Sequence, residues 1–303
     1  MSTSPLTIAA PRQTALAKAL DYLELTKPKI AVLELVVVLA AGFVATWGQP
    51  HDPALLLHAL VGTLLIAASA SAANQWLERR LDARMPRTAD RPLPACRLSP
   101  AEAIAFSGLT LIAGAIYLGW LVNAACLAWA LLTWALYVLA YTPLKTVSTA
   151  NTAVGAVAGS LPVMIGWSAA GGALGARAAA LVLVLFLWQF PHFMAIAWLY
   201  RKDYAGAGYR MLTVVDPSGR RAGWQSVVAA LALVPVSLIP MLGTAGVGGA
   251  LYAAGASLLG IGYLALAARF WRQADDRSAR LLLRGSLVYL PTLLVMLLLA
   301  PWI

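Results

Sequence analysis

The chain has 303 residues, of which 61% are hydrophobic and 11% charged, and its mean hydropathy is +0.78. A soluble core of this size cannot bury so much apolar side chain, so the composition excludes a soluble protein and predicts one that crosses a membrane several times. The net charge of +10 does not indicate nucleic-acid binding, because the basic residues are spread over five membrane-proximal sites. The expected partner of these residues is the lipid bilayer.

Nine apolar runs are long enough to cross a bilayer. They lie at 30–47, 54–74, 103–122, 124–142, 150–170, 178–198, 225–245, 248–268 and 282–301. The sequence therefore predicts an all-α polytopic membrane protein with one domain over residues 1–303. The first 25 residues of this domain are expected to be flexible. Of the 22 Lys and Arg residues, 21 fall on one side of this topology. The positive-inside rule places that side and the N-terminus in the cytoplasm, and the C-terminus outside.

Three oxygen-bearing side chains follow one another at intervals of four residues at the end of the second run. Asn74, Glu78 and Asp82 would share one helix face over about 12 Å of axis. Like charges stacked in this way repel unless a cation lies among them, and carboxylate and amide oxygens suit Mg²⁺. The alternative is that the two acids pair with neighbouring arginines on a solvated helix end. These arginines are Arg79, Arg80 and Arg84.

The segment "RMPRTADRPL" follows directly after this helix face. Arginine binds phosphate oxygens through two parallel hydrogen bonds, and a metal ion beside arginine is a usual way to hold a diphosphate. The prolines of the segment end the helix and stiffen the loop, which limits the entropy lost on closing over a ligand. The pattern favours a diphosphate site that includes Arg87, Thr88 and Arg91.

The element Asn-x-x-x-Glu-x-x-x-Asp resembles the first aspartate-rich motif of the UbiA superfamily of intramembrane prenyltransferases. Its continuation "DARMPRTADRPLP" and three further segments are similar to the members of that superfamily that attach a farnesyl group to haem. The three segments are "LTKPKI", "YTPLKTVSTANTAVGAVAGSLPVMIGW" and "FLWQFPHFMAIAWLYRKDYAGAGYRML". The resemblance covers about residues 25–212, and topology alone supports the rest of the chain.

The resemblance implies nine helices around a central cavity with a cytoplasmic cap, in a bacterial inner membrane. It implies a Mg²⁺-dependent enzyme that moves a farnesyl group from farnesyl diphosphate to a vinyl group of haem b, after which water completes haem O. Haem A synthase or the assembly of a terminal oxidase would be the protein partner. The usual first aspartate is Glu78 here, and the second acidic motif offers only Asp203, so the number of Mg²⁺ ions stays open.

The resemblance also implies roles for single residues. Mg²⁺ would be held by Asn74, Glu78, Asp82 and Asp203, and the diphosphate by Asn74, Arg87, Thr88, Arg91 and Lys145. Lys145 would stabilise the charge that develops as the C–O bond breaks, although a lone interfacial lysine is an alternative interpretation. The expected catalytic residues are Glu78, Asp82, Lys145 and Asp203. Further pocket residues would be Tyr141, Asn151, Trp188, Gln189 and Tyr204; for Asn151, a helix-initiating amide is an equal account.

His192 lies within an apolar run, directly after Pro191. An ionisable residue inside a membrane is a functional candidate, and a proline in a helix can turn polar groups toward a cavity. For a haem substrate, the natural role of His192 is to ligate the iron or to contact the porphyrin. The alternative is a hydrogen-bonded structural histidine. His51 and His58 fall at the other side of the membrane and are expected to be incidental.

Two other functions fit parts of the pattern. A prenyltransferase acting on an aromatic quinone precursor would share the charged cap and differ in its acceptor pocket. A transporter would also suit nine helices with Glu34 and His192 inside the membrane. A transporter explains poorly why the charged residues gather on one face of the membrane instead of along a path through it.

Overall fold

The computed structural model describes residues 14–47, 52–242 and 246–303, and within these ranges the regular structure is entirely helical. Nine helical segments in the described part are long and apolar enough, by length and composition, to cross a membrane. The prediction of an all-α protein with nine spans is therefore confirmed.

The first five spans are α2 (Pro28–Ala45), α3 (Pro53–Asp82), α4 (Pro100–Leu121), α5 (Ala124–Ala135) continued by η1 (Leu136–Tyr141) and α6 (Thr142–Val147), and α7 (Asn151–Ser160) with α8 (Pro162–Ala169). The other four are α9 (Ala176–Leu199), α12 (Arg220–Leu238) with η2 (Ile239–Met241), α13 (Val247–Gln273), and α14 (Asp276–Leu299) with η3 (Ala300–Trp302). Outside the spans lie α1 (Ala15–Leu25), α10 (Arg201–Ala207) and α11 (Leu212–Val215).

Local sequence signals start several of these helices. Proline stands at the first position of α2, α3, α4 and α8, where its missing N–H costs nothing. The side chain of Asp52 accepts a hydrogen bond from the Ala54 amide at the start of α3. Ser99 and Glu102 form a reciprocal capping box at the start of α4. These caps satisfy backbone donors that would otherwise be unpaired at the membrane surface.

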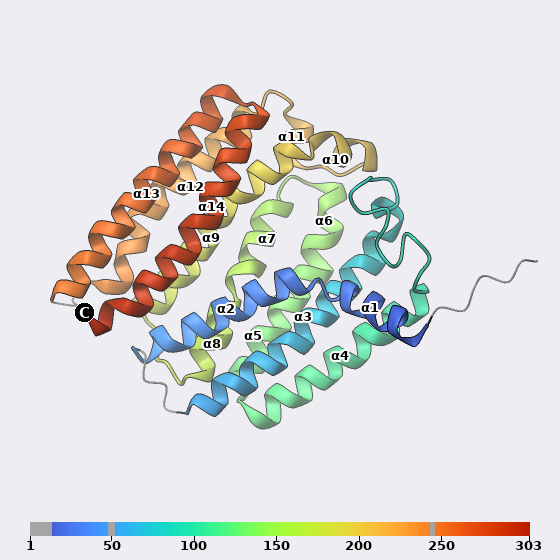
Figure 1. Ribbon diagram of the computed structural model, residues 1–303, viewed down its shortest axis with the longest axis horizontal. Helices are drawn as coiled ribbons and strands as arrows, with labels where there is room; N and C mark the ends of the chain where they lie inside the picture. The colour runs from blue at the N-terminus through green and yellow to red at the C-terminus, as the bar shows by residue number, and fades with distance from the viewer. Residues whose placement is uncertain (1–13, 48–51, 243–245) are drawn as a thin grey trace, which may run out of the picture.

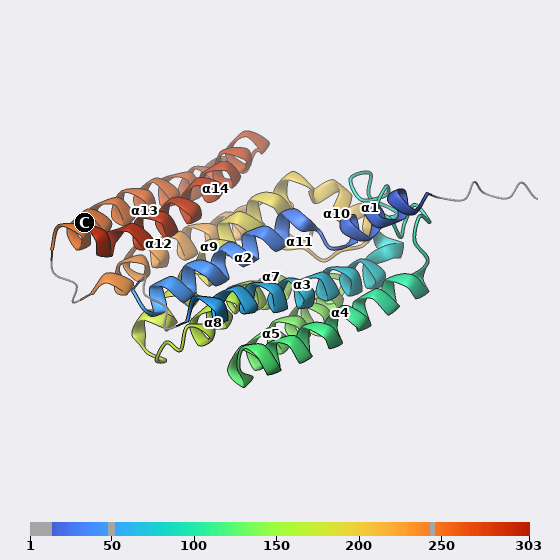
Figure 2. The same cartoon turned by 60° about the horizontal axis from the view of Figure 1, so that its bottom comes forward.

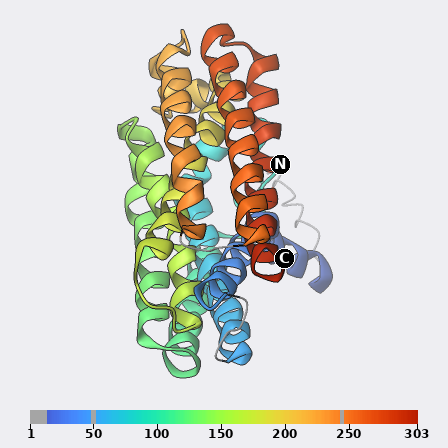
Figure 3. The same cartoon turned by 90° about the vertical axis from the view of Figure 1, so that its left-hand side faces the viewer.

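The helices pack as neighbours along a single bundle. Helix α3 packs on α4, α2 packs on α8, and α9 contacts α7, α12 and α14. Figure 3 shows the green helices of the middle of the chain and the red C-terminal helices on opposite sides of the bundle. We use the term charged end for the end that carries α1, the 83–99 loop, α6, α10 and α11 (Figures 1 and 2). The C-terminus lies at the other end, as an odd number of spans requires.

Helix α1 corrects part of one prediction. The sequence suggested a flexible segment over residues 1–25, but residues 15–25 form a helix, and residues 1–13 lie outside the described part. The helix is held because the buried Gln75 side chain donates to the Leu25 carbonyl oxygen at 2.9 Å. In addition, the Arg97 guanidinium forms ion pairs with Asp21 and Glu24. These partners are more than 45 residues away in sequence, so local patterning could not reveal them.

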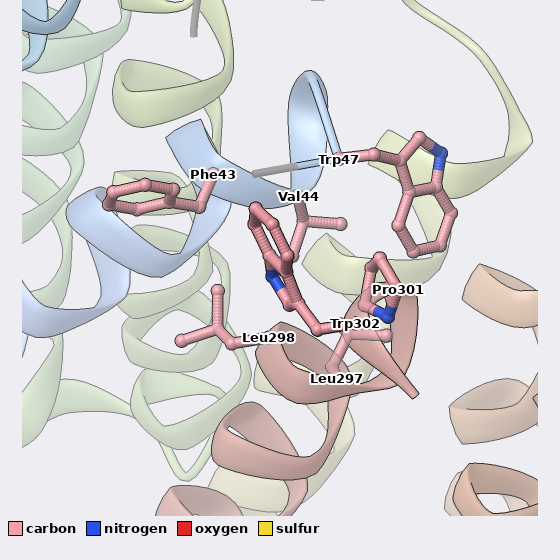
Figure 4. Close-up of a pocket in the computed structure, with 7 residues that line it drawn as sticks. All are labelled: Phe43, Val44, Trp47, Leu297, Leu298, Pro301 and Trp302. Carbon is pink, nitrogen blue, oxygen red and sulfur yellow. The ribbon is translucent and has the colours of Figure 1, made fainter. Parts of the chain in front are cut away.

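A cavity of about 210 Å³ opens at the end of the bundle opposite the charged end (Figure 4). It lies between the last turn of α2 and the C-terminal turns of the chain. Its lining residues are Phe43, Val44, Trp47, Leu297, Leu298, Pro301 and Trp302. None of these side chains can exchange a proton or bind a hard metal ion, so this cavity is not a candidate for the chemistry.

Close packing between α2 and α8 depends on a glycine. A Cβ atom at Gly166 would overlap the backbone oxygen of Val38. We therefore expect Gly166→Ala to lower the free energy of unfolding by about 1–3 kcal/mol, because one of the two backbones must move. Gly108 in α4 has open space around its Cβ position, and Gly108→Ala should be neutral or stabilising by up to about 1 kcal/mol. Thermal unfolding of both variants in the same detergent checks this, and equal midpoints would contradict it.

Candidate active site

A small polar cavity of about 100 Å³ lies at the charged end; we call it the cap pocket. Its walls come from the start of α2, from α3 and the loop that follows it, from η1 and α6, and from α10 and the loop before α11. The lining residues are Lys27, Asn74, Glu78, Asp82, Met85, Arg87, Arg91, Tyr137, Tyr141, Lys145, Tyr204, Tyr209 and Met211. Most of the side chains predicted from sequence to act on a diphosphate are thus brought together.

One face of α3 forms the floor of the cap pocket. Asn74, Glu78 and Asp82 all line the pocket, as their spacing predicts, and their exposed fractions are only 0%, 6% and 1%. Buried carboxylates of this kind require partners. The predicted alternative, pairing with Arg79, Arg80 and Arg84 on a solvated helix end, does not apply, because the acids are buried and their partners come from elsewhere.

Each polar group of this face has a basic partner from a different segment. The Lys145 ammonium lies 2.7 Å from Glu78 Oε1, and Arg91 Nη1 lies 2.7 Å from Asp82 Oδ2. Lys27 Nζ donates to Asn74 Oδ1 at 2.6 Å. The start of α2, the loop after α3 and helix α6 are therefore all attached to α3 through charged or amide groups at the pocket.

A turn of π-helix shapes the wall opposite the floor. Thr142, the first residue of α6 after η1, donates its hydroxyl to the Tyr137 carbonyl oxygen at 2.8 Å and accepts from Asn74 Nδ2 at 3.0 Å. This bond fixes the orientation of the Asn74 amide, so that its oxygen faces Lys27. Single π-helical turns inside α-helices occur often at functional sites. Here the turn brings Tyr137 and Tyr141 to the pocket, and Lys145 Nζ lies 4.5 Å from the centre of the Tyr141 ring.

The loop after α3 is held over the pocket by stacking and by a hydroxyl. The Arg87 guanidinium lies 4.6 Å from the Tyr200 ring centre and 5.0 Å from that of Tyr204. Thr88 was expected to bind the diphosphate, but its hydroxyl donates to the Asp82 carbonyl oxygen at 2.8 Å and Thr88 is not among the lining residues. This expectation is corrected: the buried hydroxyl satisfies the end of α3 and shapes the loop.

The cap pocket carries an excess of positive charge. Four basic side chains, Lys27, Arg87, Arg91 and Lys145, face two carboxylates, so the charges of the lining residues sum to +2 when Lys27 is protonated. Burial and, to a smaller extent, the neighbouring Arg91 guanidinium lower the pKa of the Lys27 ammonium to about 7, although the Glu78 carboxylate opposes this shift. An environment that disfavours another cation in this way favours an anionic ligand.

Tyr209 closes the pocket from the loop before α11. It is 3% exposed, and its backbone amide donates to the Tyr204 carbonyl oxygen. Burial raises the pKa of the Tyr209 hydroxyl well above its usual value, and the Glu78 carboxylate raises it further. The hydroxyl therefore stays protonated at neutral pH and is available as a donor.

The donor set of the pocket fits a hard divalent cation. Two carboxylates and one amide oxygen on α3 match the way in which Mg²⁺ is bound through one or two carboxylates and completed by substrate phosphates. The predicted fourth ligand, Asp203, lies on α10 and does not line the pocket, so its role as a ligand stays a prediction. Among the residues that the structure describes, no group of three or more His, Cys, Asp or Glu side chains could hold a metal ion.

Three further predicted pocket residues have structural partners instead. Asn151 is fully buried and donates to the Ser148 and Arg210 carbonyl oxygens, which fastens the loop before α11 to α7. Gln189 Nε2 donates to the Ala156 carbonyl oxygen and so joins α9 to α7. Trp188 Nε1 donates to the Ser286 carbonyl oxygen of α14 at 2.9 Å. None of the three lines the cap pocket, and their place beside the substrate stays a prediction.

His192 lies on α9 with its side chain toward α14, and it is not among the residues that line the cap pocket. Its Nδ1 is 2.8 Å from the Ser286 hydroxyl oxygen, and its ring stacks on that of Trp188 with centres 4.8 Å apart. His192 is only partly buried. His58 lies in α3 toward the other end of the bundle, with Nδ1 2.9 Å from the Tyr117 hydroxyl, and His51 lies outside the described residues.

Sequence reasoning missed five lining residues of the cap pocket. The segment "LTKPKI" already drew attention to the start of α2, but nothing in it distinguishes Lys27 from Lys29 as the residue that points into the pocket. The other four are Met85, Tyr137, Tyr209 and Met211. Met85 and Met211 belong to one buried cluster that joins the two loops. No local signal identifies such residues, because contacts between loops define them.

Comparison with known proteins places this geometry in a family. The model of the UbiA prenyltransferase family matches residues 35–299. The chain belongs to the UbiA prenyltransferase family. It is therefore an integral membrane prenyltransferase, and the cap pocket lies on the element that resembles the family's first aspartate-rich motif.

Relatives in this family are similar over nearly their whole length. The protoheme IX farnesyltransferase of Solibacter usitatus is 43% identical over 282 residues, which cover 89% of this chain and 95% of that protein. The protein of the same name from Rhodopirellula baltica is 44% identical over 290 residues, covering 90% and 97%. Among solved structures, a UbiA homologue from Archaeoglobus fulgidus bound to DMAPP and Mg²⁺ matches with a TM-score of 0.72 at 15% identity, covering 93% of this chain and 99% of that one. That likeness establishes the fold.

Proposed function

We propose that this prenyltransferase moves the farnesyl group of farnesyl diphosphate to a vinyl group of haem b, with addition of water, to give haem O. The likeness to named relatives carries the proposal, and the chemistry of the cap pocket agrees with it. The chain is more than 40% identical, over nearly full length, to proteins named for farnesyl transfer to protoheme IX, and it places two buried carboxylates among four cations in one pocket.

The diphosphate of the substrate would lie in the cap pocket. Arg87 and Arg91 extend from the loop after α3, and Lys145 enters from α6, so phosphate oxygens would meet donors from separate segments. A cavity of about 100 Å³ suits the head group rather than the farnesyl chain. The isoprenoid chain would therefore leave the pocket between the apolar helices, where lipid and protein both favour it.

Glu78, Asp82 and Asn74 would hold Mg²⁺ at this pocket. The ion would neutralise charge on the departing diphosphate. For their oxygens to become ligands, the basic partners Lys145, Arg91 and Lys27 would move their donors from the α3 side chains to phosphate oxygens. The same cations would thus balance the acids without substrate and the diphosphate with it.

The transfer itself breaks the C1–O bond of farnesyl diphosphate, and the electron pair leaves with the diphosphate. The terminal carbon of the haem vinyl group then bonds to C1, the positive charge moves to the inner vinyl carbon, and water adds there with loss of a proton. The rings of Tyr137 and Tyr141 line the pocket and can stabilise the allylic cation through their faces. Exclusion of bulk water until carbon–carbon bond formation prevents hydrolysis to farnesol.

His192 is the proposed contact to haem. The hydrogen bond between Nδ1 and the Ser286 hydroxyl leaves Nε2 as the nitrogen that would face the iron or the porphyrin. Stacking on Trp188 fixes the plane of the imidazole. A ring nitrogen oriented by a partner on the other nitrogen is the usual arrangement of a histidine that binds iron.

The charged end of the bundle is proposed to face the cytoplasm of a bacterial cell, with the protein in the inner membrane. Among the described residues, Arg177 is the one basic side chain assigned to the other side of the membrane, which follows the positive-inside rule. Haem A synthase or the assembly of a terminal oxidase is the proposed destination of the product.

The test is to express the chain in a membrane that contains haem b and farnesyl diphosphate but no haem O, and to analyse extracted pigment by mass spectrometry. Appearance of haem O supports the proposal. A purified protein that retains no b-type haem and prenylates an aromatic quinone precursor instead would overturn it. Solute flux in liposomes without farnesyl transfer would indicate a transporter.

A further inference from the structure

Lys27 is the one residue of the cap pocket that comes from the start of the first span. It stands between α1 and α2, and its ammonium reaches Asn74 on α3 at 2.6 Å. Figure 2 shows α1 and the adjoining start of α2 at the same end of the bundle as α10. Lys27 therefore faces the pocket from a different segment than Arg87, Arg91 and Lys145 do.

The backbone at Lys27 is in an unfavourable conformation. Its φ and ψ are 53° and 61°, in the left-handed region that favours glycine, and it precedes Pro28. A side chain is disfavoured there for two reasons: the Cβ atom crowds the carbonyl oxygen, and a following proline disfavours helical backbone angles. Non-glycine residues held in such conformations cluster at functional sites. The strain turns the chain from α1 into α2 and directs this lysine inward.

Neighbouring contacts hold this conformation in place. Leu25 is fully buried, and its carbonyl oxygen accepts from the Gln75 side chain on α3. At the other side, the Ile30 amide donates to the Lys27 carbonyl oxygen and begins α2. The position of the ammonium is therefore determined by two helices that pack against the floor of the pocket.

We propose that Lys27 is a diphosphate-binding residue, whose ammonium holds Asn74 and a phosphate oxygen of the prenyl donor together. An ammonium has three donors, and among the described residues Lys27 Nζ donates one hydrogen bond, to Asn74, so donors remain for phosphate. The inference rests on the proposed function, because it takes a prenyl diphosphate to be the ligand of the cap pocket. It makes the α1–α2 junction a fourth wall of the substrate site.

Lys27→Gly removes the ammonium and also relieves the backbone strain, so a loss of ligand affinity in this variant cannot come from a strained backbone. Glycine adopts positive φ without cost, so this variant should keep its thermal unfolding midpoint or raise it. Affinity for farnesyl thiolodiphosphate, a slowly ionising analogue, should fall about 10- to 100-fold when measured by titration with Mg²⁺ present. Affinity for farnesol, which lacks the diphosphate, should not change. Lys27→Arg should retain affinity for the analogue to within a few-fold.

Lys29→Ala is the matched control. Lys29 is exposed, lies two residues along in the same segment, and does not line the pocket, so its loss removes the same charge without effect on affinity. Equal affinity of Lys27→Gly and the unmodified protein for the analogue would overturn this inference alone. An equal loss in both lysine variants would also overturn it. Failure of the unmodified protein to bind the analogue would overturn the proposed function as well.

Discussion

Asp82→Asn is expected to reduce haem O formation by about 10²- to 10³-fold while the protein remains folded in the membrane. The Asp82 carboxylate is 1% exposed and lies 2.7 Å from the Arg91 guanidinium, at the base of the cap pocket. The amide keeps the shape but removes the negative charge that would hold Mg²⁺ and orient Arg91. The measurement is haem O per unit of membrane protein, determined by mass spectrometry of extracted pigment.

Asp90→Asn controls for loss of one acidic group in the same loop. Asp90 is exposed and does not line the pocket, so its substitution should leave product formation unchanged. Elution of both variants as single species in detergent shows that folding is retained. Near-normal turnover by Asp82→Asn would sink the assignment of the cap pocket as the active site.

His192→Ala is expected to weaken binding of haem b by about 10- to 100-fold and to leave binding of farnesyl thiolodiphosphate unchanged. The reason is spatial: the His192 side chain contacts α14 from α9, whereas the basic residues proposed to bind the diphosphate line the cap pocket. The haem titration is followed by its visible absorption spectrum. The spectrum is a second measure, because loss of an imidazole ligand shifts the Soret band.

His58→Ala is the matched control for this experiment. It removes an imidazole that also has a hydroxyl partner, Tyr117, but lies in α3 toward the other end of the bundle. If the haem titration curves of His192→Ala and the unmodified protein coincide, His192 does not bind haem. Its role is then structural, in joining α9 to α14. A loss of both ligands in parallel would indicate a folding defect and count equally against the assignment.

Local sequence determined the spans and the floor of the site. A run of about twenty apolar residues must form a helix in a bilayer, because backbone polar groups have no other partners there. The period of the α-helix then places Asn74, Glu78 and Asp82 on one face, whatever surrounds it. The concentration of basic residues in alternate loops also predicted that these loops share one side, and the 83–99 loop and α10 lie at the same end of the bundle (Figure 1).

Only the tertiary structure decided which groups meet that face. Thr88 and Asp203 have suitable side chains at suitable places in the sequence, yet the Thr88 hydroxyl bonds to the backbone at the end of α3 and Asp203 lies outside the pocket. Lys27 and Tyr209 enter instead, the first from 47 residues before Asn74 and the second from 127 residues after Asp82. The residues of one helix face follow from the geometry of that helix, but the residues opposite it follow from loop contacts and ion pairs that exist only once the bundle has assembled.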